Sequence, residues 1–347
     1  MDPRGAAAIA DPAGSVEELP AASEHCAGLL EARRKTEGEL RTLRERVDLA
    51  LLPGRTSLVL FGSWGRHELT EESDDDWALL VGDPDLNLED PAVLAALEHV
   101  REIFKAGTAP GRQGYFGCAF HSDPLRERIG LDEDDTRNLT RRMLLLLESV
   151  AVTGADVHRS VQDQALERYL ERHHNDFRPP RFLVNDILRY WRTICVDFEG
   201  KLAQDRREGA AKDKFVMRNA KLRTSRKMLY ASGLLPALLC HHLRADDMHN
   251  FLRQHIDAVA TDRVARAFLH LGPTDPAVRT MAAYSDWISL ISSKANRHEL
   301  GRLDQASRYD SALFAEVRRI GEMLDNGLTG LLFESSLSQI APKYIVL

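Results

Sequence analysis

The stretch of sequence that decides the fold runs from Leu58 to Val81 and reads LVLFGSWGRHELTEESDDDWALLV. Its first apolar run, Leu58 to Phe61, is short and ends at a glycine, which is typical of a buried strand that leads into a turn. We expect a helix to follow this turn. A second apolar run, Trp77 to Val81, comes directly after three aspartates and predicts another strand.

The glycine turn after the first strand contains candidate phosphate-binding residues, Gly62 and Ser63. Glycine lets the backbone approach a phosphate closely. The first N–H groups of a helix and the Ser63 hydroxyl can donate hydrogen bonds to phosphate oxygens. The turn therefore predicts a phosphate-binding site.

Asp74 and Asp76 precede the second strand and are candidate metal ligands. Side chains alternate between the two faces of a strand, so these two carboxylates point the same way and Asp75 points away. Carboxylates on one face suit Mg²⁺ or Mn²⁺ bound to a nucleoside triphosphate.

The order of these features resembles the DNA polymerase beta superfamily of nucleotidyltransferases, whose pattern is Gly-Ser, a spacer, and Asp-x-Asp in a strand. The fuller pattern Gly-Ser-Trp-Gly-Arg-x-Glu-x-Thr-x-x-Ser-Asp-x-Asp-Trp is similar to bacterial nucleotidyltransferases related to the uridylyltransferase and adenylyltransferase enzymes of nitrogen regulation. The resemblance extends over residues 25 to 340, although only this motif is sharp. It implies transfer of a nucleoside monophosphate with release of pyrophosphate. The paired carboxylates predict Mg²⁺ or Mn²⁺ as the cofactor, and ATP is only the first choice of substrate, because no short motif fixes which base is recognised.

The superfamily often uses a third carboxylate from a later strand, and the resemblance makes Asp123 the candidate for a third catalytic metal ligand. Asp123 follows a strand predicted over 115–120. The alternative is a turn or helix-capping aspartate. Arg66 is a candidate phosphate contact, with a structural ion pair to Glu68 as the alternative.

From residue 138 onward the chain is predicted to be almost entirely helical. The clearest amphipathic helix spans 182–202, where apolar residues recur every three or four positions. The predicted fold class is therefore α+β: a small mixed-sheet nucleotidyltransferase domain followed by an all-helical domain, with the active site between them. We expect a flexible lead over 1–20, the nucleotidyltransferase domain over 21–160 and the helical substrate-side domain over 161–347.

A basic segment in the helical half contains two further candidate nucleotide-binding residues. If one helix covers this segment, Arg218, Lys221 and Ser225 share a face. Such a face could hold the outer phosphates, and the resemblance nominates Lys221 for this role. The alternative is an ordinary charged helix surface.

Composition limits the location and the partners. The 347-residue chain has a net charge of −7, which does not favour nucleic acid as the main partner. Its four cysteines are widely scattered, as expected of reduced thiols in a cytoplasmic protein. No apolar run approaches the roughly 20 residues of a membrane helix. We therefore expect a cytoplasmic location and no membrane partner.

Three functions remain open from the sequence. The first is transfer of AMP or UMP to an unidentified protein or small-molecule acceptor. The second is joining of nucleotides, either as a cyclic or linear signal or as an extension of RNA. The third is a non-catalytic regulatory partner that binds nucleotides.

Overall fold

The computed structural model describes residues 14–104, 114–207, 215–272 and 274–345. They divide into two compact units, one containing residues 32–172 and the other containing the described residues before Ala32 together with those from His173 onward. The coarse prediction of an α+β fold with a helical C-terminal region is confirmed. Along the chain, the two units meet after residues 31 and 172, whereas the sequence predicted domain boundaries after residues 20 and 160.

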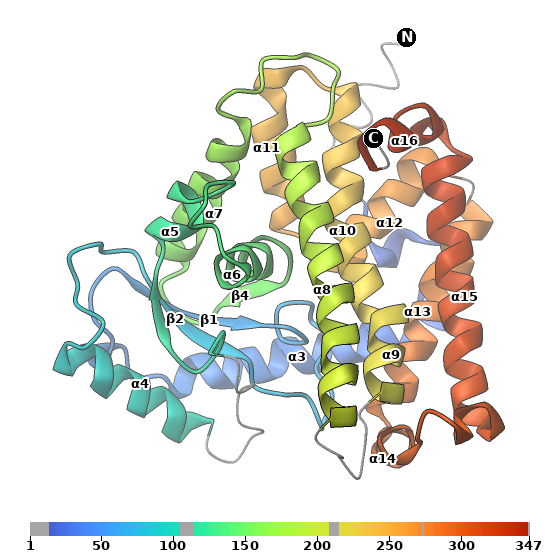
Figure 1. Ribbon diagram of the computed structural model, residues 1–347, viewed down its shortest axis with the longest axis horizontal. Helices are drawn as coiled ribbons and strands as arrows, with labels where there is room; N and C mark the ends of the chain where they lie inside the picture. The colour runs from blue at the N-terminus through green and yellow to red at the C-terminus, as the bar shows by residue number, and fades with distance from the viewer. Residues whose placement is uncertain (1–13, 105–113, 208–214, 273, 346–347) are drawn as a thin grey trace. The chain divides into compact units, whose positions relative to one another are not determined.

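The unit of residues 32–172 is built on a four-stranded mixed sheet (Figure 1). Its strands are β1 (Thr56–Phe61), β2 (Trp77–Val81), β3 (Ala119–His121) and β4 (Ser149–Ala151). The spatial order is β3-β2-β1-β4. β1 is antiparallel to both β2 and β4, whereas β2 and β3 are parallel. The two central strands are the apolar runs on either side of the glycine turn and the aspartates.

One face of the sheet is covered by α3 (Ala27–Arg46) and α4 (Pro91–Ile103) (Figure 1). Leu58, Leu60 and Leu79 of the strands pack with apolar side chains of these helices. The start of α4 follows from its sequence, because Asp90 accepts a hydrogen bond from the Ala92 N–H at 2.8 Å and proline occupies the first turn.

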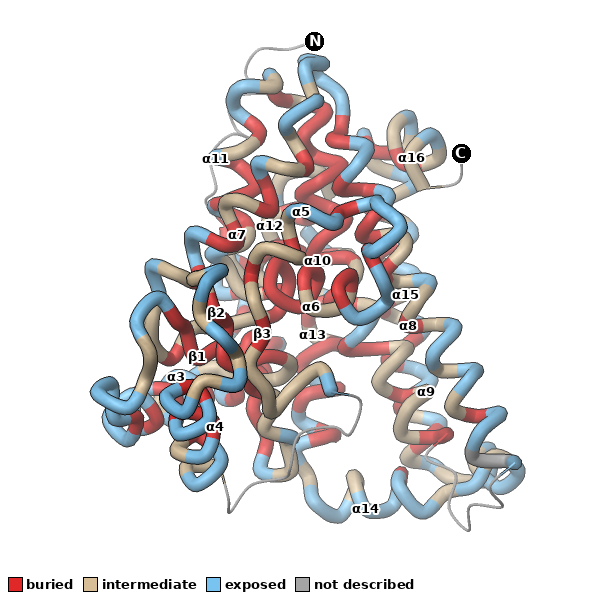
Figure 2. Tube along the Cα trace, turned by 60° about the vertical axis from the view of Figure 1, so that its left-hand side comes forward, coloured by how far each residue is buried: buried red, intermediate tan, exposed pale blue. Residues whose placement is uncertain are grey.

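The opposite side of this unit contains α5 (Asp123–Glu127), α6 (Thr136–Leu147) and α7 (Ala155–Leu170). Figure 2 shows that α6 and the central strands are largely buried. The chain from residue 138 onward was expected to be almost entirely helical, but α6 ends at Leu147 and the residues that follow pair with β1 as strand β4. A short 3₁₀ helix, η2 (Leu49–Leu51), precedes β1.

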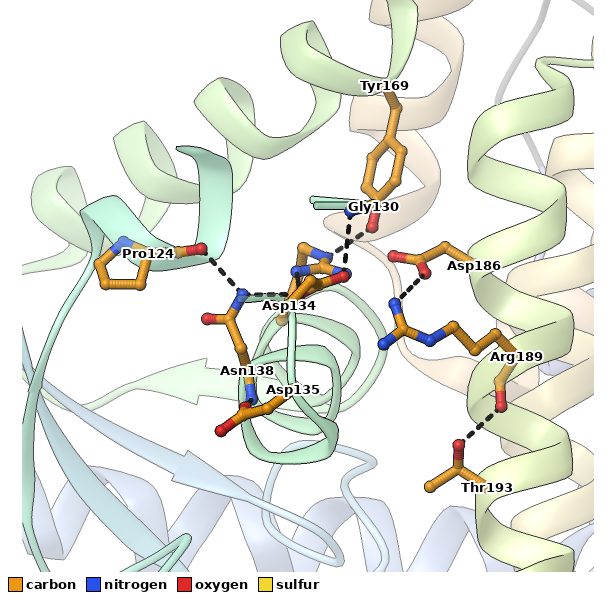
Figure 3. A network of polar contacts seen from close by, with 10 residues as sticks. Pro124, Gly130, Asp134, Asp135, Asn138, Tyr169, Asp186, Arg189 and Thr193 are labelled. Atoms are coloured by element: carbon orange, nitrogen blue, oxygen red, sulfur yellow. Dashed lines mark hydrogen bonds and ion pairs between the residues drawn. The ribbon is translucent and has the colours of Figure 1, made fainter. Parts of the chain in front are cut away.

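A buried polar network connects α5, α6 and α7 (Figure 3). The Arg142 side chain is fully buried, and its guanidinium donates to both carboxylate oxygens of Asp134 at 2.9 and 3.0 Å. Its Nε donates to the Tyr169 hydroxyl at 2.6 Å, and Asn138 donates to Asp134 at 2.7 Å. The network fixes the loop before α6 against the helix itself.

The other unit is helical throughout its described part. Its elements are η1 (Val16–Glu18), α2 (Ala22–His25), α8 (Arg181–Arg207), α9 (Phe215–Arg223), α10 (Ser225–Leu239), η3 (Cys240–His242), α11 (Ala245–Ile256), α12 (Ala260–Leu271), α13 (Thr274–Ser292), α14 (Lys294–Arg302), η4 (Ser307–Asp310), α15 (Ala312–Phe333), η5 (Ser336–Gln339) and α16 (Ala341–Ile345). The helix predicted over 182–202 is present as α8. Its apolar stripe packs inward, with Leu183 and Ile187 buried and Trp191 stacked on Tyr230 at 4.9 Å.

The segment that precedes α3 and the first turn of α3 belong to this helical unit. The Val16 N–H donates to Asp262 at 3.0 Å, and the Leu29 N–H donates to the Ser285 hydroxyl at 3.1 Å. Residues 14–20, expected to be part of a flexible lead, are therefore folded onto helix α12. Residues 1–13 of that predicted lead lie outside the described residues.

Across the described parts of the chain, none of the helices combines the length and the apolar character needed to cross a membrane.

Candidate active site

The candidate site begins where β1 ends at a glycine turn. Gly62 has a φ of +66°, a conformation that glycine adopts without the steric cost paid by other residues. The chain then forms consecutive turns over residues 62–67, in which the Arg66 N–H donates to the Gly62 carbonyl at 3.0 Å and the Glu68 N–H to the Ser63 carbonyl at 2.8 Å. The expected helix after this turn is absent, so that part of the prediction is wrong.

Polar groups of this turn are available to a ligand. Within the described part of the chain, the N–H groups of Gly62, Ser63 and Trp64 have no hydrogen-bond acceptor, and neither does the Ser63 hydroxyl. Successive backbone N–H groups in a turn form concave sites for anions, even without a helix. The turn can therefore donate hydrogen bonds to phosphate oxygens.

Asp76 joins the carboxylate pair to the glycine turn. Its carbonyl accepts a hydrogen bond from the Phe61 N–H at 2.8 Å, which extends the β1–β2 ladder to the start of the turn. Its side-chain Oδ2 lies 3.3 Å from the position that a Cβ atom on residue 62 would occupy. Asp76 is half-buried and Asp74 is exposed. A carboxylate thus lies against a backbone turn that carries no side chain at the point of contact.

The middle aspartate has a different role. The indole Nε1–H of Trp64 donates to Oδ1 of Asp75 at 3.0 Å, and Trp64 packs in the core on the α3 and α4 face of the sheet. Burial raises the pKa of Asp75, the bond from Trp64 lowers it, the charge of Asp74 raises it, and the net pKa lies above its ordinary value. Asp75 therefore acts as a structural acceptor.

Arg66 is engaged within the protein. Its Nε donates to Glu68 at 2.8 Å, and its Nη1 donates to Glu148. Both glutamates are buried. A Cβ atom on Gly65 would lie 2.0 Å from the Glu148 carbonyl oxygen, so only glycine fits this approach of the turn to the start of β4. Arg66 thus forms the ion pair with Glu68 that was the structural alternative for this residue. Phosphate binding by Arg66 stays a prediction.

Asp123 lies at the opposite end of the strands from Asp76. In the parallel β2–β3 pair, Val81 is in register with His121, so Asp123 follows the C-terminal end of β2 while Asp76 precedes its N-terminal end. At about 3.3 Å per residue, the two aspartates are separated by roughly 20 Å along the strand direction. The structure thus contradicts the prediction of Asp123 as a third ligand: it occupies the first turn of α5, the alternative considered for it.

The described residues contain no group of three or more His, Cys, Asp or Glu side chains that could hold one metal ion. The pair of Asp74 and Asp76 nevertheless fits the chemistry of Mg²⁺ or Mn²⁺, because both ions prefer oxygen ligands and commonly take only one or two carboxylates beside substrate phosphates. Apart from the chain neighbours of Gly62, Asp76 Oδ2 is the only described atom within 4 Å of the position that a Cβ atom on residue 62 would occupy, so no side chain of the turn separates Asp76 from a phosphate bound there.

Lys221 and Ser225 belong to the helical unit. They lie on two helices rather than one, because α9 ends at Arg223 and α10 begins at Ser225 after a non-helical Thr224. Lys221 is half-buried, and Ser225 is buried with its hydroxyl donating to the Lys221 carbonyl at 3.4 Å. The prediction that one helix carries both residues is wrong. Phosphate binding by Lys221 or Ser225 stays a prediction. An active site between the two domains also stays a prediction.

Comparison with known proteins adds no family assignment: no protein-family model matches the chain, and no curated protein shows significant similarity to it.

Proposed function

We propose that this protein is a metal-dependent nucleotidyltransferase that transfers a nucleoside monophosphate, with AMP from ATP as the first choice, to a hydroxyl group of a protein or small molecule. The observation that carries the proposal is the position of the Asp76 carboxylate beside the glycine turn. Its Oδ2 lies 3.3 Å from the point that a Cβ atom on residue 62 would occupy. It joins a candidate metal ligand to a turn with available N–H donors. The resemblance of the motif to the DNA polymerase beta superfamily supports the same activity.

In the proposed site, Gly62 and Ser63 bind and orient phosphate oxygens, and Asp74 and Asp76 would hold Mg²⁺ or Mn²⁺. When bound, the metal ion supplies positive charge that offsets the charge of the phosphates and makes an attacking hydroxyl more acidic. Arg66 and Gly65 hold the turn against the start of β4, so the donors are positioned before the substrate arrives. Such preorganisation avoids reorganisation during reaction.

The proposed reaction is an in-line displacement at the α-phosphorus. The acceptor oxygen forms a bond to the α-phosphorus, and the bond from this phosphorus to the oxygen that bridges to the β-phosphorus breaks. Pyrophosphate leaves, and the proton of the acceptor hydroxyl passes to solvent. The product is a phosphodiester between the nucleotide and the acceptor.

We place the protein in the cytoplasm. All four cysteines are free thiols, and free thiols persist in reducing compartments.

A non-catalytic role as a nucleotide-binding regulatory partner is the second candidate. It is favoured by the β2–β3 register, which separates Asp123 from Asp76 and leaves two aspartates at the site. Binding of ATP without turnover, with the same affinity after Asp74→Asn and Asp76→Asn, would favour this role over catalysis.

The test is mass spectrometry of reactions that contain the purified chain, a mixture of nucleoside triphosphates, MgCl₂ or MnCl₂, and a cell extract. We expect a nucleotide adduct on a protein or small molecule with the wild type, and none with Asp74→Asn/Asp76→Asn. Asp75→Asn is the matched control, because Asp75 lies between them in sequence and bonds to Trp64. A nucleotide product that forms without any acceptor would instead identify a nucleotide-joining enzyme.

A further inference from the structure

Arg141 of α6 lies on the same face of the sheet as Asp76. Leu80 and Phe120 are in register in the parallel β2–β3 pair. Because side chains alternate, Asp76, four residues before Leu80, and Cys118, two residues before Phe120, point to the same face as this pair. The Arg141 guanidinium lies 4.4 Å from the centroid of the Phe120 ring and 3.4 Å from the Cys118 sulfur.

The strand geometry places this guanidinium near the candidate site. A strand spacing of about 4.8 Å and an offset of two residues at about 3.3 Å each put the Cα atoms of Cys118 and Asp76 roughly 8 Å apart. The aromatic contact between Phe61 of β1 and Phe116, at 5.6 Å, lies on the same side. A triphosphate that begins at Gly62 and Asp76 can therefore extend toward Arg141 without leaving this unit.

Arg141 is held in place but incompletely paired. One of its terminal nitrogens donates to the Gly114 carbonyl at 2.9 Å and to Cys118. Its Nε is buried with no hydrogen-bond partner in the described part of the chain, and no carboxylate among the described residues forms an ion pair with it. The carboxylate of Asp135, which influences Arg141 from a distance, already accepts the Asn138 N–H at 2.7 Å as the cap of α6. The guanidinium is thus held in one position and still has N–H groups, including Nε–H, that can donate to a ligand.

A second arginine adds to this positive charge. Arg137 precedes Arg141 by four residues on α6 and is exposed, without an ion-pair partner among the described residues. Burial lowers the pKa of Arg141, and the charge of Arg137 lowers it further. Like charges at this spacing destabilise a helix. A bound phosphate anion would convert this repulsion into charge-assisted hydrogen bonds.

We propose that Arg141, assisted by Arg137, binds the β- and γ-phosphates of the nucleoside triphosphate whose α-phosphate lies at Gly62 and Asp76. This inference rests on the proposed function and assigns the outer phosphates to the sheet-containing unit, whereas the resemblance nominated Lys221 of the helical unit. Cations at this position would also stabilise the charge that develops on departing pyrophosphate.

The test is calorimetric titration of the full chain in MgCl₂ with ATP, AMP and inorganic tripolyphosphate. We expect Arg141→Gln to weaken ATP and tripolyphosphate binding at least tenfold, and Arg137→Gln to weaken them three- to fivefold. AMP binding should stay within twofold of the wild type. Arg126→Gln is the matched control, because Arg126 is an arginine of the same unit that bonds to Gln164 and Glu127, and it should bind all three probes as the wild type does.

Because Arg141 packs on Phe120, its replacement could impair folding, so Arg137→Glu provides an independent test. This exposed charge reversal should weaken ATP binding at least tenfold with an unchanged melting temperature. If the wild type binds neither ATP nor tripolyphosphate, the proposed function and this inference fail together. If the wild type binds ATP, and folded Arg141→Gln and Arg137→Glu bind it equally well, the inference alone is overturned.

Discussion

The indole N–H of Trp64 donates a hydrogen bond to the carboxylate of Asp75 at 3.0 Å. This bond connects the glycine turn to the aspartate segment on the core face of the sheet. The Asp75 side chain therefore lies on the core face, whereas the carboxylate of Asp76 lies against Gly62. Three consecutive aspartates therefore have distinct environments, and substitutions at neighbouring positions should have different effects.

We predict that Asp75→Asn leaves activity intact and changes the free energy of unfolding by less than about 1 kcal/mol at neutral pH. The asparagine carbonyl can still accept from Trp64, and the variant carries no half-buried charge. The folded-state pKa of Asp75 is raised above its ordinary value of 3.8, so its ionisation lowers the stability of the wild type as pH rises from about 4 through that pKa. Unfolding measured against pH should show the variant gaining stability relative to the wild type over this interval. If Asp75→Asn instead lost stability relative to the wild type over this interval, a raised folded-state pKa for Asp75 would be contradicted.

Asp76→Asn should reduce the rate of nucleotide transfer at least about 100-fold, because removal of a metal ligand costs several kcal/mol of transition-state stabilisation. Asp123→Asn should stay within about twofold of the wild type, since the β2–β3 register places Asp123 beyond the far end of the strands. The measurement is the initial rate of adduct formation at saturating ATP, with melting temperatures to confirm folding. Equal losses in the two variants would contradict the site as described.

The local pattern of the sequence predicts the central strands and the separation of the three aspartates. Both are short-range properties, because apolar run length indicates a buried strand and alternation decides which side chains share a face. The glycine turn is also a short-range feature, although the polar residues after it form turns where a helix was expected. The Trp64 bond to Asp75 agrees with this alternation.

The position of β3 could not be predicted in the same way. Its strand spans Ala119–His121 rather than 115–120, and its register depends on pairing with β2, including the Gly117 N–H bond to the Trp77 carbonyl at 2.7 Å. Asp123 was misplaced for this reason. The ion pair of Arg66 and Glu148 joins residues 82 positions apart, so no local periodicity points to it.

Gly62→Ala should impair activity more than stability. At a φ of +66° an alanine costs about 1–2 kcal/mol, and its Cβ atom would lie 3.3 Å from Asp76 Oδ2, closer than ordinary contact. The carboxylate must shift by a few tenths of an ångström, which alters the proposed metal site. Gly38→Ala is the control. Apart from its chain neighbours and the backbone of its own helix, none of the described residues places an atom within 4 Å of a Cβ atom at this position of α3, so the substitution should stabilise the helix by about 0.5–1 kcal/mol without changing activity. Wild-type activity in folded Gly62→Ala would show that the contact is not needed.

The buried pair of Asp134 and Arg142 should control the acid stability of the sheet-containing unit. Burial favours the neutral form of Asp134, but the bonds and positive charge of Arg142 outweigh it and hold the pKa of Asp134 well below its ordinary range. A lowered folded-state pKa means that the pair's stabilisation is present above the ordinary value of 3.8 and is lost as pH falls below it. Asp134→Asn should destabilise the unit by about 3–5 kcal/mol at pH 7, because it leaves the guanidinium buried without its anion.

Replacing both partners should be much less harmful than replacing one. Asp134→Asn/Arg142→Met removes the buried charge altogether, and an apolar side chain of similar length can occupy the space under Tyr169. We expect the double variant to recover at least about 1 kcal/mol of the loss and to lack the wild type's decline below pH 4. Hydrogen exchange of the α6 amides, measured from pH 3 to 7, follows this unit apart from the helical one. Equal protection in all variants would mean that the pair makes no net contribution to the stability of the unit.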